Sequence, residues 1–128
     1  MRRWFPFIAW TVFVGFIVCS AGCGRLRAFF AWYEQRPFAD KFGHIGLVGM
    51  MAFLLDHALA GRTIRRSPVP YAATIVFVVM TIEETSQIWI PSRDFEFGDL
   101  AANYAGILMA VFASRIPMVG KLCSRSFQ

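Results

Sequence analysis

Four long apolar segments alternate with short polar ones along this 128-residue chain. A helix needs about 20 mostly apolar residues to cross the hydrocarbon of a bilayer, where its backbone groups find no water. Each segment comes close to that length, and the first contains no charged residue. We therefore expect an all-α fold, a four-helix transmembrane bundle in one domain of residues 1–128, with spans at about 4–22, 42–60, 71–90 and 100–119.

The composition favours a lipid environment over a water-soluble core. Hydrophobic residues make up 57% of the chain and charged residues 16%, with a mean hydropathy of +0.52, whereas soluble domains carry about 25% charged residues. The net charge of +5 is spread in short clusters between the apolar segments rather than along one stripe. This pattern indicates membrane topology signals and argues against a nucleic-acid partner.

The orientation follows from the distribution of lysine and arginine over the short loops, because these residues accumulate on the cytoplasmic side. One side of the predicted bundle collects Arg2, Arg3, Arg62, Arg65, Arg66, Arg115, Lys121 and Arg125. The other side collects Arg25, Arg27, Arg36, Lys41 and Arg93, together with most of the acidic residues. We expect a multi-pass protein of the bacterial inner membrane with both termini in the cytoplasm.

Residues 24–41 join the first two predicted spans and mix aromatic with charged side chains. This mixture favours the headgroup region of a bilayer, so we expect a short interfacial helix that breaks near Pro37. A rival interpretation concerns the residues just before it. Met1-Arg2-Arg3, an apolar run and Ser20-Ala21-Gly22-Cys23 resemble a lipoprotein signal peptide, which would be cleaved and lipidated at Cys23.

The three cysteines form no CxxC motif and no Cys/His spacing typical of a zinc site. We therefore expect neither a cofactor nor a metal, and the sequence leaves the oligomeric state open.

Several polar residues gather where the predicted outer ends of the spans lie. Ionisable side chains in a span are costly, so they usually face the bundle interior or a water-filled cavity. Lys41 and His44 are three residues apart and share a helix face, as do Asp99 and Asn103, four apart. Asp99 is also placed to cap a helix N-terminus. Opposite charges are available to form two predicted pairs, Glu84 with Arg93 and Asp40 with Lys41. We expect one outer-face ligand-binding site to be formed by Asp40, Lys41, His44, Glu84, Gln87, Arg93, Asp99 and Asn103.

The same residues carry a family resemblance. Asp40-Lys41-x-x-His44, Glu84-x-x-Gln87, Arg93 and Asp99-x-x-x-Asn103 with Gly106 follow one another at spacings similar to the signature of the VanZ-like family of small integral membrane proteins. The resemblance spans about half of the chain, and Gly49-Met50-Met51 departs from it, since many members have an aromatic residue there. It implies a helical membrane fold and a link to resistance against the glycopeptide teicoplanin, or to maintenance of the cell envelope.

Three functions fit these residues. The favoured one is binding of an anionic membrane lipid or a lipid-linked envelope precursor, with Arg93 and Lys41 contacting phosphate. The second is a membrane enzyme on a lipid-linked substrate, for which the catalytic candidates are His44 and Glu84 as acid–base groups and Asp99 as the residue that orients the histidine. No nucleophile motif supports that alternative. The third is a structural or assembly partner in the envelope, in which the polar residues only hold the bundle together.

Overall fold

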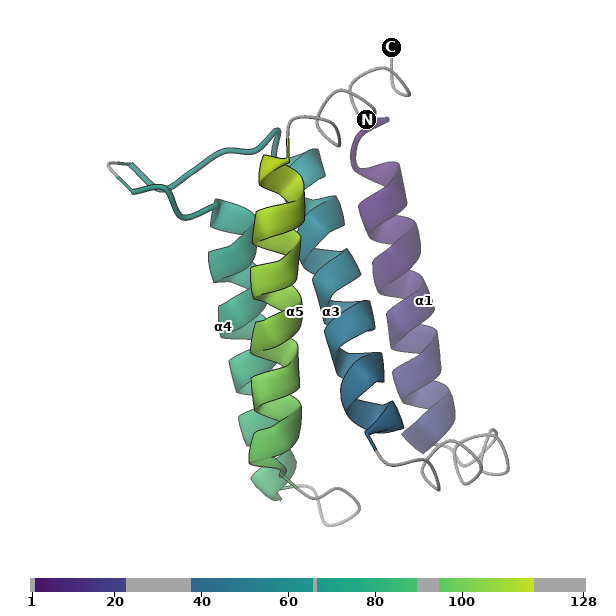
Figure 1. Cartoon of the computed structure of the whole chain (residues 1–128). Coiled ribbons are helices and arrows are strands. Elements are labelled where there is room, and N and C mark those ends of the chain that lie inside the picture. Colours follow the sequence, from purple (N-terminus) through teal and green to yellow (C-terminus); the bar gives the residue numbers. More distant parts are fainter. Residues whose placement is uncertain (1, 23–37, 66, 90–94, 117–128) are drawn as a thin grey trace.

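The computed structural model describes residues 2–22, 38–65, 67–89 and 95–116 (Figure 1). Within these residues the chain forms four α-helices, one short 3-10 helix and no β-strand. The elements are α1 (Phe5–Gly22), α3 (Ala39–Ala58), α4 (Tyr71–Ser86), η1 (Gln87–Trp89) and α5 (Phe97–Arg115). The all-α prediction is therefore confirmed.

The helix bounds differ from the predicted spans where polar residues extend a helix or a turn ends one. Helix α3 begins at Ala39 and α5 at Phe97, so both start three residues earlier than expected. Helix α4 ends at Ser86 and continues as the 3-10 turn of η1. Helix α5 ends at Arg115, before Ile116 in extended conformation, as suits a residue followed by proline. The predicted interfacial segment up to residue 37, and Cys23, lie outside the described residues.

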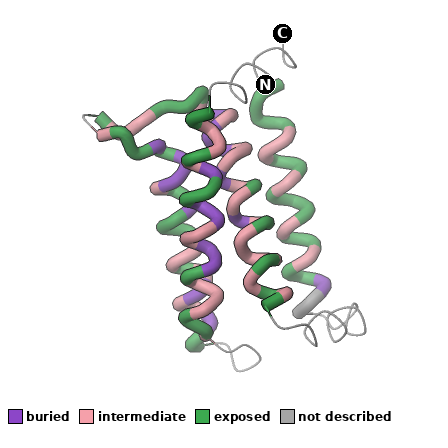
Figure 2. The backbone as a smooth tube through the Cα atoms, viewed as in Figure 1, coloured by how far each residue is buried: buried purple, intermediate pink, exposed green. Residues whose placement is uncertain are grey.

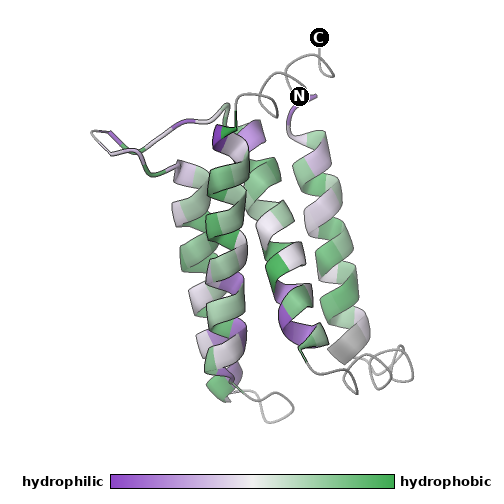
Figure 3. Ribbon diagram, in the orientation of Figure 1, coloured by the Kyte–Doolittle hydropathy of each residue, from purple (hydrophilic) through white to green (hydrophobic). Residues whose placement is uncertain are grey.

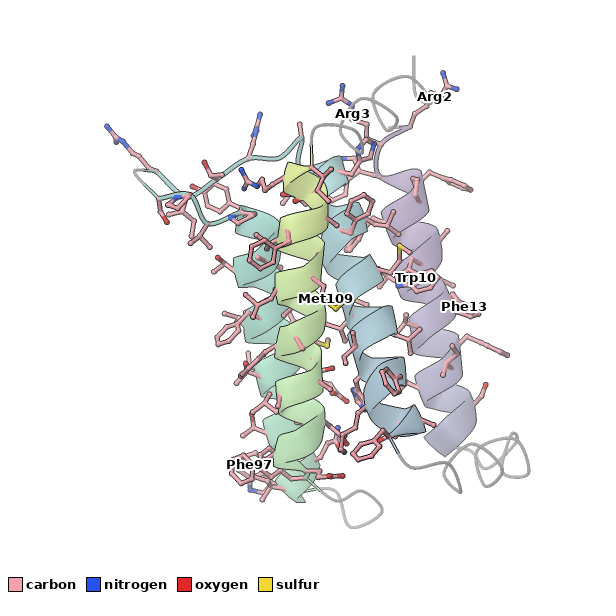
Figure 4. All side chains as sticks on the ribbon, in the orientation of Figure 1. Arg2, Arg3, Trp10, Phe13, Phe97 and Met109 are labelled. Carbon is pink, nitrogen blue, oxygen red and sulfur yellow. The ribbon has the colours of Figure 1, made fainter. Side chains whose placement is uncertain are left out.

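Helices α3, α4 and α5 pack against one another, and α1 packs on α3 (Figure 1). Trp10 anchors α1 by donating a hydrogen bond from its indole Nε1 to the backbone oxygen of Leu47, 3.1 Å away. Successive helices run in opposite directions, so the starts of α3 and α5 lie together with the ends of α1 and α4. Arg2 and Arg3 lie at the other end of the molecule from Phe97 (Figure 4).

Two glycines allow α3 and α5 to approach closely. A Cβ atom on Gly106 would lie 2.5 Å from the backbone oxygen of Ile45 and 3.0 Å from the backbone nitrogen of Gly49. No side chain fits into such a contact, and small residues at this spacing are typical of closely packed helices in membranes. The contact holds the first halves of α3 and α5 at a fixed separation.

In the described residues, small apolar and some polar side chains are buried while many large apolar side chains are exposed, which is the reverse of the pattern in a water-soluble bundle (Figure 2). The buried apolar positions are mostly small, among them Ala52, Ala72 and Ala110. The largest fully buried side chains are Glu84 and Asn103, each 1% exposed. Large apolar side chains cover the outside instead, among them Phe5, Val12, Phe16, Ile82, Leu108, Met109 and Phe112.

One of the described helices, α5, is long and apolar enough to cross a membrane, with a mean hydropathy of 1.3. Residues Phe5–Ser20 form a shorter apolar stretch.

Candidate functional site

Polar side chains concentrate where the starts of α3 and α5 meet the end of α4 (Figure 3). We call this group the polar end and define it by Asp40, Lys41, His44, Glu83, Glu84, Gln87, Glu96, Asp99 and Asn103. The antiparallel order of the helices brings these residues together, although they span more than 60 positions in the sequence. Arg93 lies outside the described residues, and so does its predicted pairing with Glu84.

Lys41 joins α3 to the start of α5. Its ammonium nitrogen lies 2.8 Å from Oε1 of Glu96 and 2.8 Å from Oδ1 of Asp99. The hydrogen bonds to Asp99 and to Glu96 raise the pKa of Lys41 above its ordinary value, so the side chain stays charged. Among the described residues Lys41 thus pairs across helices rather than with its neighbour Asp40, and the predicted Asp40–Lys41 pair is wrong. The reason is geometric, because consecutive helix positions point in different directions.

Gly98 makes room for this lysine. A Cβ atom there would lie 2.8 Å from Cε of Lys41 and 2.9 Å from its Nζ. The glycine therefore lets the lysine stem cross the first turn of α5 and reach both carboxylates.

His44 lies between two carboxylates and one buried amide. Its Nδ1 is 3.0 Å from Oδ1 of Asn103. Its Nε2 is 3.8 Å from Oδ1 of Asp40 and 3.8 Å from Oδ2 of Asp99. Both ring nitrogens therefore face oxygen atoms, and Asn103, which is 1% exposed, fixes the orientation of the ring.

Asp40 occupies the first turn of α3, with its side chain 54% exposed. Partial burial and the negative charge of Asp99 raise the pKa of Asp40 above its ordinary value, against the opposing effect of His44 and Lys41. The two carboxylates are thus close enough to repel each other.

Asp99 does not cap α5 as we expected. The N-cap residue is Glu96, which makes no side-chain capping hydrogen bond, and Asp99 lies in the first turn. Its carboxylate, 14% exposed, turns towards Lys41 and His44 instead. The negative charge still lies near the positive end of the helix dipole.

Glu84 and Gln87 form the α4 side of the polar end. The side-chain nitrogen of Gln87 donates to Oε1 of Glu83 at 3.2 Å and to Oε2 of Glu84 at 3.4 Å. The backbone N–H of Glu96 donates to Oε1 of Glu84 at 3.5 Å. Glu84 therefore ties the end of α4 to the residue just before α5.

Sequence reasoning missed Glu96. The expected site does not include this residue, whereas it contacts both Lys41 and Glu84. The one signal available was its position three residues before Asp99, which places both carboxylates in the same turn at the start of a helix.

The described part of the polar end carries more negative than positive charge. It contains five carboxylates, one lysine and one histidine, by the residues that define it. Lys41 contacts two of these carboxylates, and its single positive charge offsets only one negative charge. The arrangement is suited to holding a cation or a hydrogen-bond donor at the His44 side, and to exchanging partners on Lys41.

Neither a scan of protein-family models nor searches of curated proteins and of solved structures give a match to this chain.

Proposed function

We propose that this chain is an integral inner-membrane protein of the VanZ-like type, a four-pass helical bundle with both termini in the cytoplasm. The polar end faces outward and binds the headgroup of an anionic lipid or of a lipid-linked envelope precursor. By this proposal the protein serves envelope maintenance, and the resemblance adds a link to glycopeptide resistance.

The membrane part of the proposal rests on one observation, that large apolar side chains are exposed while polar ones are buried. In water, a helical bundle hides its large apolar residues and exposes its charged ones. Here Phe112 is 72% and Met109 61% exposed, while Glu84 and Asn103 are 1% exposed. A hydrocarbon solvent removes the cost of the exposed apolar surface and favours polar groups that bond to one another inside.

The location of the polar residues supports a headgroup site. They gather at one end of the bundle, at the depth where hydrocarbon gives way to headgroups in the proposed orientation. Phe97 and Trp89 lie beside them in the sequence and are 77% and 76% exposed. Aromatic side chains at such a level are typical of the membrane–water interface.

Lys41 provides a contact for phosphate. Its two partners differ in exposure, since the side chain of Glu96 is 58% exposed and that of Asp99 14%. Glu96 is therefore the exchangeable partner, and a phosphate oxygen can take its place while Asp99 holds the lysine. Arg93, in the segment between α4 and α5, is the second phosphate-binding residue in this proposal.

A second candidate function is acid–base catalysis on a lipid-linked substrate. It is favoured by one observation, the fixed His44 ring, with Nδ1 bonded to Asn103 and Nε2 facing Asp99. A histidine held in this way can transfer a proton. Binding has the stronger support, because the described residues provide no positioned nucleophile beside the ring.

The test is lipid co-purification. The full chain, purified in mild detergent, should retain anionic lipid that mass spectrometry identifies, and Lys41→Ala should retain several-fold less. Arg62→Ala is the matched control, because Arg62 is exposed in the loop that follows the opposite end of α3. Equal lipid profiles for wild type and Lys41→Ala would contradict the headgroup proposal, and recovery of the chain in the soluble fraction of cells would contradict the membrane proposal.

A further inference from the structure

Three side chains at the polar end converge on one point from two helices. Asp40 and His44 come from α3 and Asp99 from α5. One ligand-type atom from each residue, two carboxylate oxygens and one imidazole nitrogen, lies within 4.8 Å of the others. Such a set of oxygen and nitrogen atoms is the kind that binds first-row divalent metals.

The orientation of the imidazole ring is the first argument for an ion. Because Nδ1 faces the amide oxygen of Asn103 at 3.0 Å, it carries the proton of that hydrogen bond. Nε2 is the ring nitrogen that remains available to a metal ion, and it faces the two carboxylates. Histidines that bind metals are commonly held in this way, with the second ring nitrogen donating to an oxygen of the protein.

The distances are the second argument. Nε2 lies 3.8 Å from Asp40 and 3.8 Å from Asp99, which is too long for direct hydrogen bonds. Two ligands that bind one tetrahedral ion at about 2.1 Å lie about 3.4 Å apart. The three atoms lie within 4.8 Å of one another, so side-chain rotations that shift them by up to about 1 Å would bring them to the ligand separation of one ion.

The third argument is that the two carboxylate oxygens of Asp99 face different partners. Lys41 binds Oδ1, whereas Oδ2 faces His44. The lysine and an ion therefore use different oxygens of the same carboxylate and do not compete. Lys41 instead fixes the carboxylate in the orientation that presents Oδ2.

We propose that Asp40, His44 and Asp99 bind a divalent transition-metal ion of the Zn²⁺ class, and that Asn103 positions the histidine. The mixture of imidazole and carboxylate ligands favours such an ion over Ca²⁺ or Mg²⁺. The ligands come from two helices, 40 to 99 in the sequence, which is why the cysteine and histidine spacings gave no sign of a metal.

Three protein ligands leave a coordination position open. A phosphate oxygen of a headgroup would complete the shell, and the ion would offset the negative charge of the polar end. This role rests on the proposed function, whereas binding of the ion itself does not. The Nδ2 donor of Asn103 is buried and has no hydrogen-bond partner among the described residues, so a ligand that entered this end of the bundle would relieve an unpaired polar group.

The test measures zinc binding without lipid. The untagged full chain is purified in detergent, stripped with a chelator and titrated with ZnCl₂ by calorimetry, with Co²⁺ absorption spectra as a second readout. Wild type should bind one ion per chain. His44→Gln should lower the affinity by more than about 100-fold, because a ligand contributes more than the neighbours that orient it.

His57→Gln is the matched control, since it removes the other histidine of the same helix and should leave zinc affinity unchanged. Asp40→Asn is a second variant that leaves the core intact, because the Asp40 side chain is half exposed. It should also weaken zinc binding and alter the Co²⁺ spectrum. Far-UV circular dichroism verifies that each variant is folded.

Absence of stoichiometric zinc binding in wild type, or equal affinity in wild type and His44→Gln, would overturn the metal site. Either result would leave the headgroup proposal standing, because lipid retention is measured without added metal. Conversely, zinc binding with no retained lipid would support the site and contradict the headgroup proposal.

Discussion

Helix α3 carries an aspartate and a histidine at each of its ends, Asp40 with His44 and Asp56 with His57, and the two pairs differ in what the neighbouring helix presents to them. At the polar end, α5 supplies Asp99 and Asn103. At the opposite end, Asp56 lies beside a small pocket lined mainly by alanines and by Pro70, Val111 and Ser114. One oxygen of Asp56 is buried without a hydrogen-bond partner among the described residues.

The comparison shows that an Asp–His pair on one helix does not by itself form a site. The first pair becomes a possible ligand set because α5 adds a carboxylate and an orienting amide at the right level. Asp56 of the second pair instead lies beside a pocket lined mainly by small apolar side chains, in which Ser114 provides the one other side-chain oxygen. The close contact of α3 with α5 at Gly106 is what brings the polar partners within reach.

The largest effect should follow from widening that contact. In Gly106→Ala the added Cβ would lie 2.5 Å from the backbone oxygen of Ile45, so the helices must move apart. Overpacking of this kind costs about 1–3 kcal/mol of unfolding free energy. Denaturation in mixed micelles, followed by circular dichroism, measures it, and zinc affinity at the polar end should fall as well.

Gly46→Ala is the control for this variant. A Cβ atom there meets nothing within 4 Å, and alanine is a better helix former than glycine. We therefore expect Gly46→Ala to raise the unfolding free energy by about 0.5–1 kcal/mol. Equal stability of the two variants would show that the α3–α5 contact does not determine the geometry of the polar end.

The helices could be predicted from the sequence, whereas the contacts between polar side chains of different helices could not. Long, mostly apolar segments gave the number and approximate position of α1, α3, α4 and α5. The starts of α3 and α5 were predicted three residues too late, because both helices begin among polar residues. Apolar content locates the hydrophobic part of a helix, whereas its ends depend on local turn geometry.

Spacing along the chain identified which polar residues lie on the same face of a helix, but not which residues of other helices they contact. Lys41 reaches Asp99, 58 positions away, and not the adjacent Asp40. That choice depends on the relative height of α3 and α5, which Gly49 and Gly106 set. The three proposed metal ligands were expected to share a site but not to bind a metal, because no local motif contains a set of ligands that is divided between two helices.

A smaller effect, confined to the polar end, is expected for Asn103→Ala. The variant removes the oxygen that accepts from Nδ1 of His44, so the ring loses its fixed orientation. Loss of such an orienting group typically weakens metal binding about 10–100-fold. Zinc titration measures it, and Ser114→Ala, on α5 at the opposite end, should have no effect. An unchanged affinity in Asn103→Ala would show that the amide does not position the histidine.

The smallest effect should come from the aspartate at the opposite end. In Asp56→Asn an amide of the same shape replaces a carboxylate that is 9% exposed and has one oxygen without a hydrogen-bond partner in the described part of the chain. Removing a charge from such a position costs little, because the charge receives little compensation there. We expect the free energy of unfolding to stay the same or to rise by up to about 1 kcal/mol, and zinc affinity to remain that of wild type. Thermal unfolding and zinc titration of the same sample measure both.

A clear loss of stability would mean that Asp56 has a strong hydrogen-bonding or ionic partner. The aspartates at the two ends of α3 would then both be held by polar partners, and the contrast between the two ends would fail.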